Sequence, residues 1–268
     1  MYPVLFKLGP LEIKTYGVML VVSCVTGYLV SRPRVQRRGI DQEILLDLCF
    51  YILLSSIVGS RIFYAATHLD EYSGNPLSVF YIWEGGLSMM GGVLLCLGVS
   101  WLYLRLKGVE FILMADLLSP AIALGVGLTR IGCFLYGCCF GLPSQLPWAV
   151  QFPAVSAAGS HFHQPIHPAQ LYAVAYGLLI FGILLLIERK RPPTGVLFGT
   201  LLILYSTARF IVDFFRYYEP QQYVFETPLP LTNNQLICLG LFVFGCYRIL
   251  AAYRTRGALK KRFQAPRD

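Results

Sequence analysis

Seven long apolar stretches, nearly free of acidic and basic residues, follow one another along the chain. A charged side chain at the centre of a bilayer costs about 2.5 to 3.5 kcal/mol, so stretches of this kind mark candidate membrane spans. Each has about 17 to 22 residues, enough to cross a hydrocarbon core of about 30 Å as a helix that rises about 1.5 Å per residue. They cover Thr15–Ser31, Leu45–Ala66, Gly85–Leu104, Phe111–Leu128, Pro168–Ile187, Gly195–Phe214 and Asn233–Tyr253. The pattern predicts an all-α polytopic membrane protein with seven transmembrane helices.

Composition excludes a soluble globule. Of the 268 residues, 56% are hydrophobic and only 13% are charged, against about 25% charged in a typical soluble domain. So few charged side chains cannot cover a soluble particle of this size, whereas lipid requires no charged cover. We therefore expect residues 1–268 to form a single membrane domain. Because residues 1–10 lack a basic region followed by an apolar core, we expect no cleavable signal peptide.

Basic residues cluster at alternate ends of the spans. Sixteen of the 22 lysines and arginines fall in residues 32–38, 105–107, 189–191 and 248–267. Cytoplasmic connections of membrane proteins carry an excess of Lys and Arg, so this asymmetry predicts an N-terminus outside and a C-terminus inside. Residues 248–268 then form a basic cytoplasmic tail, which we expect to be attracted to anionic lipid headgroups rather than to nucleic acid.

The long connection between the fourth and fifth spans, residues 133–167, is rich in Gly, Pro, Ser and aromatic residues. This composition predicts a small folded cap on the outer side rather than a disordered loop. His161, His163 and His167 lie in this segment, but their spacing matches no zinc pattern, and we expect no metal there.

Three arginines lie inside predicted spans. Counted from the inner ends of their helices, Arg61, Arg130 and Arg209 lie at depths of roughly 24, 27 and 21 Å at 1.5 Å per residue. Each arginine alone is explained by a local partner such as Asp213, or by a side chain that reaches the interface. Three at one depth favour an anion site instead, because guanidinium binds phosphate with two parallel hydrogen bonds. The expected anion is the phosphate of a membrane lipid.

Polar residues of the sixth span share one helix face. Tyr205, Arg209, Asp213 and Arg216 follow the spacing i, i+4, i+8 and i+11, which aligns side chains on an α-helix. We expect this stripe to point into the helix bundle. His167 and Gln170, at the outer start of the fifth span, place further polar groups at the same level.

Cysteines cluster at one point of the chain. Cys133, Cys138 and Cys139 have the spacing C-x4-C-C, which is neither a redox C-x-x-C motif nor a ferredoxin pattern. We interpret them as small residues in a turn in which Gly137 permits close backbone approach. A catalytic thiol among them is the alternative.

Four motifs, taken together, resemble the prolipoprotein diacylglyceryl transferase family. They are the segments Trp83–Gly92, Arg130–Gly141, His167–Tyr172 and Tyr205–Arg216, and they occur in the order found in the family. The likeness extends over nearly the whole chain. Each motif alone is weak, whereas the set is specific.

The resemblance implies a seven-span enzyme of the bacterial inner membrane. Such an enzyme transfers the diacylglyceryl group of phosphatidylglycerol to the lipobox cysteine of a prolipoprotein, forming a thioether and releasing glycerol phosphate. It implies no cofactor and no metal; its partners are phosphatidylglycerol, prolipoprotein signal peptides and membrane lipids. The matching positions imply functional roles for Tyr16, Arg61, Arg130, Gly141, Tyr205 and Arg209.

Three positions depart from the family pattern. Met90 stands where a histidine is common, Tyr136 where asparagine is frequent, and Asp213 where glutamate is usual. Methionine cannot accept a proton, so we expect the arginines to favour the acceptor thiolate directly and to stabilise the departing phosphate. Asp213 then orients Arg209.

Two other functions stay open at this point. A divergent relative would act on another acceptor or only bind lipid. An anion transporter would need polar residues along a path to the inner face, but the inner halves of the spans are largely Leu, Val, Ile and Phe, with Asp47 and Asp116 as exceptions.

Overall fold

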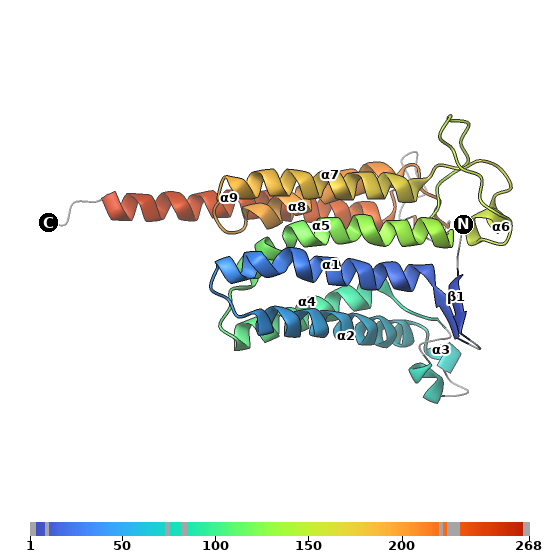
Figure 1. The fold of residues 1–268 in the computed structure, drawn as a ribbon, viewed down its shortest axis with the longest axis horizontal. Helices are drawn as coiled ribbons and strands as arrows, with labels where there is room; N and C mark the ends of the chain where they lie inside the picture. Colours follow the sequence, from blue (N-terminus) through green and yellow to red (C-terminus); the bar gives the residue numbers. More distant parts are fainter. Residues whose placement is uncertain are drawn as a thin grey trace. The chain divides into compact units, whose positions relative to one another are not determined.

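Seven helices in the described part of the chain are long and apolar enough to cross a membrane (Figure 1). The computed structural model describes residues 4–8, 11–72, 76–81, 85–219, 222–223 and 231–264. The predicted seven-span polytopic fold is confirmed, while the direction in which the spans cross the membrane stays a prediction. The helices are α1 (Thr15–Arg37), α2 (Gln42–Thr67), α4 (Met89–Leu106), α5 (Phe111–Tyr136), α7 (Ala169–Arg189), α8 (Val196–Asp213) and α9 (Asn233–Gln264).

Short elements lie outside these spans. Strands β1 (Val4–Leu8) and β2 (Leu11–Lys14) form an antiparallel pair directly before α1. The hydrophobic pattern does not predict this pair, because strands of five and four residues give too few positions for an alternation of apolar and polar residues. The remaining short helices are α3 (Leu69–Tyr72), η1 (Pro76–Phe80) and α6 (Ala157–His161).

The chain falls into two compact units. The first unit comprises residues 1–31 and 115–268, and the second comprises residues 32–114. The single membrane domain therefore stays a prediction. Of the predicted basic tail, α9 reaches Gln264, and residues 265–268 lie outside the described part, as do Trp83 and Glu84 of the first motif.

Small residues hold α2 against α4 in the second unit. A Cβ atom added to Gly59 would lie 2.5 Å from the carbonyl oxygen of Gly91, and Gly91 and Gly92 are buried. The two backbones therefore pack in direct contact, as small residues allow in membrane helices. Tyr103 donates a hydrogen bond of 2.8 Å to Asp47, which links the same two helices by their polar groups.

In the first unit, α7 contacts both α5 and α8, and α8 packs against α9. Its core is a cluster that includes Ala123 of α5, Ile180 and Leu184 of α7 and Leu201 of α8. Helix α1 follows α5 closely: Ser23 donates a hydrogen bond of 3.2 Å to the Gly125 carbonyl.

Large apolar side chains cover the outer faces of the spans. Val21, Phe50, Leu179 and Val243 are 61%, 61%, 65% and 66% exposed. A soluble domain rarely exposes so much apolar area, whereas lipid tails are the matching environment for it.

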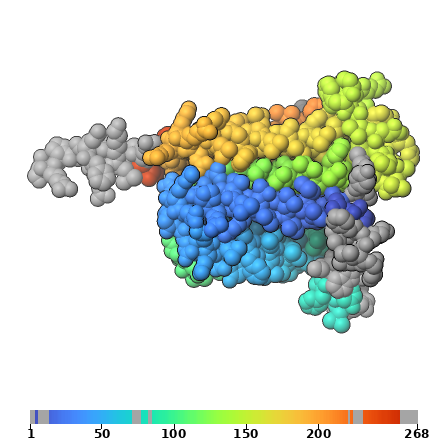
Figure 2. Space-filling view, viewed as in Figure 1, coloured from blue at the N-terminus to red at the C-terminus, as the bar shows by residue number. Residues whose placement is uncertain are grey.

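The segment between α5 and α7 has its own small core. Phe152, Ala158 and Ile166 are buried together, with Phe134 and Phe140 packed against them. Figure 2 shows this segment as a yellow-green lobe at the end of α7. The segment is therefore folded rather than extended. Its position on the outer side of a membrane stays a prediction.

Asp116 of α5 caps the N-terminus of α8. Its two carboxylate oxygens accept hydrogen bonds from the backbone N–H groups of Gly195, at 2.6 Å, and Phe198, at 2.7 Å. The first N–H groups of a helix have no partner within the helix, and a negative charge near them is favourable. Asp116 is only 6% exposed. A carboxylate that seemed an exception in an apolar span therefore fixes the start of the helix that carries Arg209.

We expect Asp116→Ala to lower the free energy of unfolding by about 1 to 3 kcal/mol, because it leaves one buried and one partly buried N–H group without acceptors. Denaturant unfolding of the detergent-solubilised protein measures the change. Asp41→Ala is the control: Asp41 caps α2 through one exposed bond to Glu43 and should cost about 1 kcal/mol or less. Equal losses in both variants would contradict the role given to Asp116.

Candidate active site

A buried ion pair lies at the end of α8. Arg209 Nη1 lies 3.0 Å from Asp213 Oδ1, and the two side chains are 9% and 0% exposed. The i, i+4 spacing aligned these residues on one face, and the structure brings them into contact. Two opposite charges removed from water need further hydrogen bonds to be stable.

Tyr218 supplies these hydrogen bonds. Its hydroxyl donates to Asp213 Oδ1 at 2.8 Å and accepts from Arg209 Nη2 at 2.7 Å. Arg216 Nη1, at 3.3 Å, and Asn234 Nδ2, at 3.0 Å, also donate to it. Burial is the main cause that raises the pKa of Tyr218, so its hydroxyl keeps its proton at neutral pH. One phenol thus holds Arg209, Asp213 and Arg216 in fixed positions.

The start of α9 adds a further support. Thr232 and Gln235 form a capping box, in which the Gln235 N–H donates to Thr232 Oγ1 at 3.2 Å and the Thr232 N–H donates to Gln235 Oε1 at 2.9 Å. The Thr232 hydroxyl lies 3.5 Å from Asp213 Oδ2. The beginning of α9 is therefore fixed against the carboxylate that pairs with Arg209.

Arg130 differs from Arg209 in its partners. Its guanidinium donates only a long contact of 3.9 Å to Cys133 Sγ, and no described carboxylate lies within 4.0 Å of it. Tyr176 and Tyr205 lie within electrostatic range of both Arg130 and Arg209. Two cations thus lie near the same pair of phenols, and among the described residues only Arg209 has an acidic partner.

Three buried polar atoms of the first unit have no hydrogen-bond partner in the described part of the chain. The Tyr176 hydroxyl, Gln170 Oε1 and Arg216 Nε are buried without a hydrogen bond to any described residue. Such atoms are rare in folded proteins and call for an explanation, such as a bound ligand. Gln170 is held in place because its Nε2 donates to the Cys138 carbonyl at 2.7 Å.

Gly141 lies where three backbone segments meet. A Cβ atom at this position would lie 2.5 Å from the His167 carbonyl oxygen and 2.7 Å from that of Phe215. Only glycine fits here without moving one of these segments. His167 accepts or donates a hydrogen bond of 3.0 Å with the Tyr172 hydroxyl, and burial lowers its pKa, which favours the neutral imidazole.

Tyr16 lies at the start of α1, next to α5. A Cβ atom on Gly132 would lie 3.3 Å from the Tyr16 Cα atom, and Arg130 and the three clustered cysteines are within electrostatic range of the phenol. The Tyr16 side chain is half exposed rather than packed away. It can therefore contact a lipid or peptide beside Arg130.

The Arg61 guanidinium, in the second unit, donates hydrogen bonds to five backbone carbonyl groups. Nε donates to the Val79 carbonyl at 2.6 Å, Nη1 to Gly85 at 2.7 Å and Gly86 at 3.1 Å, and Nη2 to Ser78 at 2.6 Å and Tyr81 at 3.3 Å. These contacts explain a buried arginine as the residue that holds the loop between α2 and α4. A role of Arg61 in substrate binding stays a prediction.

Three cysteine thiols converge beside Arg130. The sulfur atoms of Cys133, Cys138 and Cys139 lie within 4.8 Å of one another. Hydrogen bonds with the other two thiols lower the pKa of Cys139, and the nearby Arg216 and Arg130 guanidinium groups lower it further. The pKa of Cys138 is raised by hydrogen bonds with its two neighbours. The neighbouring thiols and guanidinium groups therefore favour loss of a proton from Cys139 over loss of one from Cys138.

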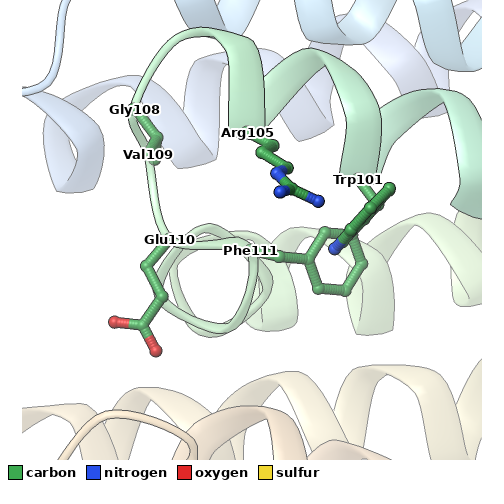
Figure 3. A pocket seen from close by; sticks show the side chains of 6 residues that line it. All are labelled: Trp101, Arg105, Gly108, Val109, Glu110 and Phe111. Atoms are coloured by element: carbon green, nitrogen blue, oxygen red, sulfur yellow. The ribbon is translucent and has the colours of Figure 1, made fainter.

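A recess of about 380 Å³ lies elsewhere, at the turn between α4 and α5. Figure 3 shows Arg105 extending toward Trp101 while Glu110 points away; the guanidinium carbon lies 5.2 Å from the Trp101 ring centroid. None of the predicted site residues lines it. An aromatic and a basic residue at the end of a span are typical of anchoring at a membrane interface.

Sequence reasoning missed three residues of the site. Tyr176 lies on the fifth span, Tyr218 follows the sixth, and Asn234 begins the seventh. The only sequence signal is T-x-x-Q at Thr232–Gln235, which marks the start of a helix. Tyr176, Tyr218 and Asn234 take part through contacts between segments that are distant in sequence, and no local pattern marks such contacts.

Comparisons with known proteins agree with these observations. The profile of the prolipoprotein diacylglyceryl transferase family matches residues 3–251. Relatives named phosphatidylglycerol–prolipoprotein diacylglyceryl transferase include one from Geobacter sulfurreducens, 35% identical over 247 residues, covering 91% of this chain and 92% of the relative. One from Methylococcus capsulatus is 35% identical over 263 residues, covering 96% and 97%. One from Bordetella avium is 36% identical over 248 residues, covering 91% of each.

The matched range contains Arg130, Arg209 and Gly141. It also contains α1, α2, α4, α5, α7 and α8 in full and the first part of α9. The resemblance inferred from the four motifs is confirmed, and the chain belongs to the prolipoprotein diacylglyceryl transferase family.

Proposed function

We propose that the protein transfers the diacylglyceryl group of phosphatidylglycerol to the lipobox cysteine of prolipoproteins, the first step of lipoprotein maturation. The acceptor sulfur, as thiolate, attacks the carbon of the diacylglyceryl group that is bonded to the phosphate oxygen. The carbon–oxygen bond breaks, glycerol phosphate leaves with the electron pair, and a thioether forms. Family membership and the names of the relatives support this reaction.

The phosphate of the lipid binds at Arg130. The observation that supports this most strongly is that Arg130, half-buried in a span, has no acidic partner among the described residues. Three polar atoms of the same unit, on Gln170, Tyr176 and Arg216, are also buried without partners among those residues. An anion with several acceptor oxygens would satisfy a guanidinium and a phenol together. Phosphate has such oxygens, and arginine binds it with two parallel hydrogen bonds.

Arg209 stabilises the leaving group. Asp213 and Tyr218 fix its guanidinium before the substrate arrives, so no reorganisation is needed when negative charge develops on the departing phosphate oxygen. Tyr205 lies on the same face of α8 and donates a hydrogen bond to the same oxygens. Arg130, Arg209, Asp213 and Tyr205 are therefore the proposed catalytic set.

The remaining predicted residues bind the substrates. Tyr16 lies beside Arg130 at the start of α1. Gln170 and Arg216 each have a buried polar atom without a hydrogen bond to any described residue. Gly141 and His167 lie against each other in the segment that follows α5. We place the glycerol headgroup among Gln170, Arg216 and His167, and the acyl chains along the exposed apolar faces of the helices.

The acceptor thiol needs no histidine base in this mechanism. Met90 lies in the first turn of α4. Its thioether cannot act as a base. Cationic groups lower the pKa of a nearby thiol from about 8.5 toward neutral. The arginines therefore stabilise the thiolate electrostatically, and the thiol proton passes to solvent.

We place the protein in the bacterial cytoplasmic membrane, with the active site toward the outer leaflet. The basic connections and the tail at residues 248–268 then face the cytoplasm. The cap at residues 133–167 faces the outer compartment, where the lipobox of a translocated signal peptide is accessible. This arrangement brings lipid from the side and peptide from outside.

We expect Arg130→Lys and Arg209→Lys each to lower kcat/KM by about 100-fold or more, since lysine keeps the charge but loses the planar fork that binds phosphate. Thioether formation from phosphatidylglycerol and a lipobox peptide is the assay. Arg254→Lys, on the exposed face of α9, is the matched control and should be unchanged. Normal activity in the first two variants would overturn the phosphate site.

Tyr218→Phe should lower activity about tenfold, because it removes the hydroxyl that holds Arg209 while leaving the ring and the ion pair in place. Tyr217→Phe is the control: the structure gives that residue ring contacts with Phe140 and His161, so its hydroxyl should be dispensable. Activity and thermal unfolding are measured together. A loss in both variants, or in neither, would show that Tyr218 does not position Arg209.

Met90→His should leave the rate unchanged, and the wild-type rate should rise with pH as the acceptor thiol deprotonates, rather than follow an imidazole with a pKa near 6.5. Met89→His, one residue earlier in the same exposed turn, controls for adding an imidazole. Product formation only in Met90→His would show that this chain has lost transfer to lipobox thiols.

A further inference from the structure

The end of α5 brings two cysteines together by backbone geometry alone. Gly137 has a φ of 83°, and the N–H groups of Gly137 and Cys138 both donate to the Cys133 carbonyl, at 2.9 and 3.1 Å. This is the glycine-terminated helix end in which the side chains of the residues corresponding to Cys133 and Cys138 contact each other. In most proteins that contact is hydrophobic, whereas here both side chains are thiols.

Cys139 completes the group through a backbone conformation that residues other than glycine rarely adopt. Its φ is 59°, in the left-handed region, where an L-residue with a Cβ atom is disfavoured. The conformation turns the third sulfur toward the other two, so that all three lie within 4.8 Å of one another. Sulfurs that share one zinc ion at about 2.3 Å each lie about 4 Å apart. The observed cluster needs only small rotations to reach that geometry.

The surrounding charges suit bound thiolates. Cys133 Sγ lies 3.9 Å from Arg130 Nη1, and Cys139 is within electrostatic range of Arg130 and Arg216. Three thiolates and one divalent ion together carry one net negative charge, which an adjacent guanidinium offsets. Among the residues that the structure describes, no other group of three His, Cys, Asp or Glu side chains converges in this way.

We propose that Cys133, Cys138 and Cys139 form a three-thiolate site for a thiophilic metal ion, Zn²⁺ in the first instance. Each thiol loses its proton to solvent when the ion binds, and the ion keeps its oxidation state. Thiolate ligands select zinc or monovalent copper over hard cations. The fourth position of a tetrahedral ion stays open to water or another ligand. This binding does not depend on the proposed transferase reaction.

A bound ion would stiffen the turn that carries Gly141. The Gly137–Gly141 segment leads from the cluster to the point where Gly141 packs on His167 and Phe215, and the Cys138 carbonyl accepts the hydrogen bond from Gln170. Metal binding to folded but not unfolded protein raises stability by mass action. The ion would therefore link the end of α5 to the start of α7.

The test uses the full-length protein, purified in detergent with reductant and freed of metal by chelation. Titration with Zn²⁺ should give one bound ion per chain, with a higher unfolding temperature. Titration with Co²⁺ as the spectroscopic substitute should give thiolate-to-metal charge-transfer absorption. Cys133→Ser, Cys138→Ser and Cys139→Ser should each weaken binding by more than about 100-fold, since loss of even a group that supports a metal ligand costs about 10 to 100-fold.

Cys24→Ser and Cys49→Ser, at cysteines outside the cluster, are the matched controls and should bind as wild type does. Cys133→Ala serves as a second variant if the serine disturbs the buried helix end. The proposal is overturned if folded wild-type protein binds neither Zn²⁺ nor Cu⁺, or if the cluster variants bind as the controls do. A disulfide among the three cysteines that forms without reductant, together with no metal binding after reduction, would replace the metal site by a redox pair.

Discussion

The buried pair of Arg209 and Asp213 is the interaction on which the rest of the site depends. An unpaired charge at this depth would be strongly destabilising, and the pair is stable because Tyr218 and Thr232 supply the remaining hydrogen bonds. These residues belong to α8, to the segment after it and to the start of α9. The contacts that neutralise the charge therefore also link these three segments and fix the orientation of the Arg209 guanidinium.

Arg130, by contrast, has no acidic partner in the part of the chain that the structure describes. With one arginine neutralised internally and the other not, the two cations beside Tyr176 and Tyr205 retain a positive charge for an anion. An enzyme that releases a phosphate needs a site that binds the group before reaction and stabilises added charge during it. Division of these roles between Arg130 and Arg209 is the central claim of the proposed mechanism.

Local pattern predicted the spans and the contact between Arg209 and Asp213, because both follow from helical spacing within one segment. It did not predict Tyr218 or Asn234, since their roles come from packing between segments that are distant in sequence. Depth in the membrane and the family resemblance both group Arg61 with the other arginines, whereas its five carbonyl partners come from a loop whose path the sequence does not predict. Gly137 did predict the turn that holds the three cysteines, but the C-x4-C-C spacing did not predict that their sulfur atoms converge, because this depends on the backbone conformation of Cys139.

A structure of the protein with bound phosphatidylglycerol would test the central claim most directly. We predict phosphate oxygens about 2.7 to 2.9 Å from the Arg130 guanidinium, with Arg209 still paired to Asp213 and the Tyr176 hydroxyl donating to the headgroup. A headgroup seated instead in the recess beside Trp101 and Arg105, with Arg130 still without an anionic partner, would contradict the account.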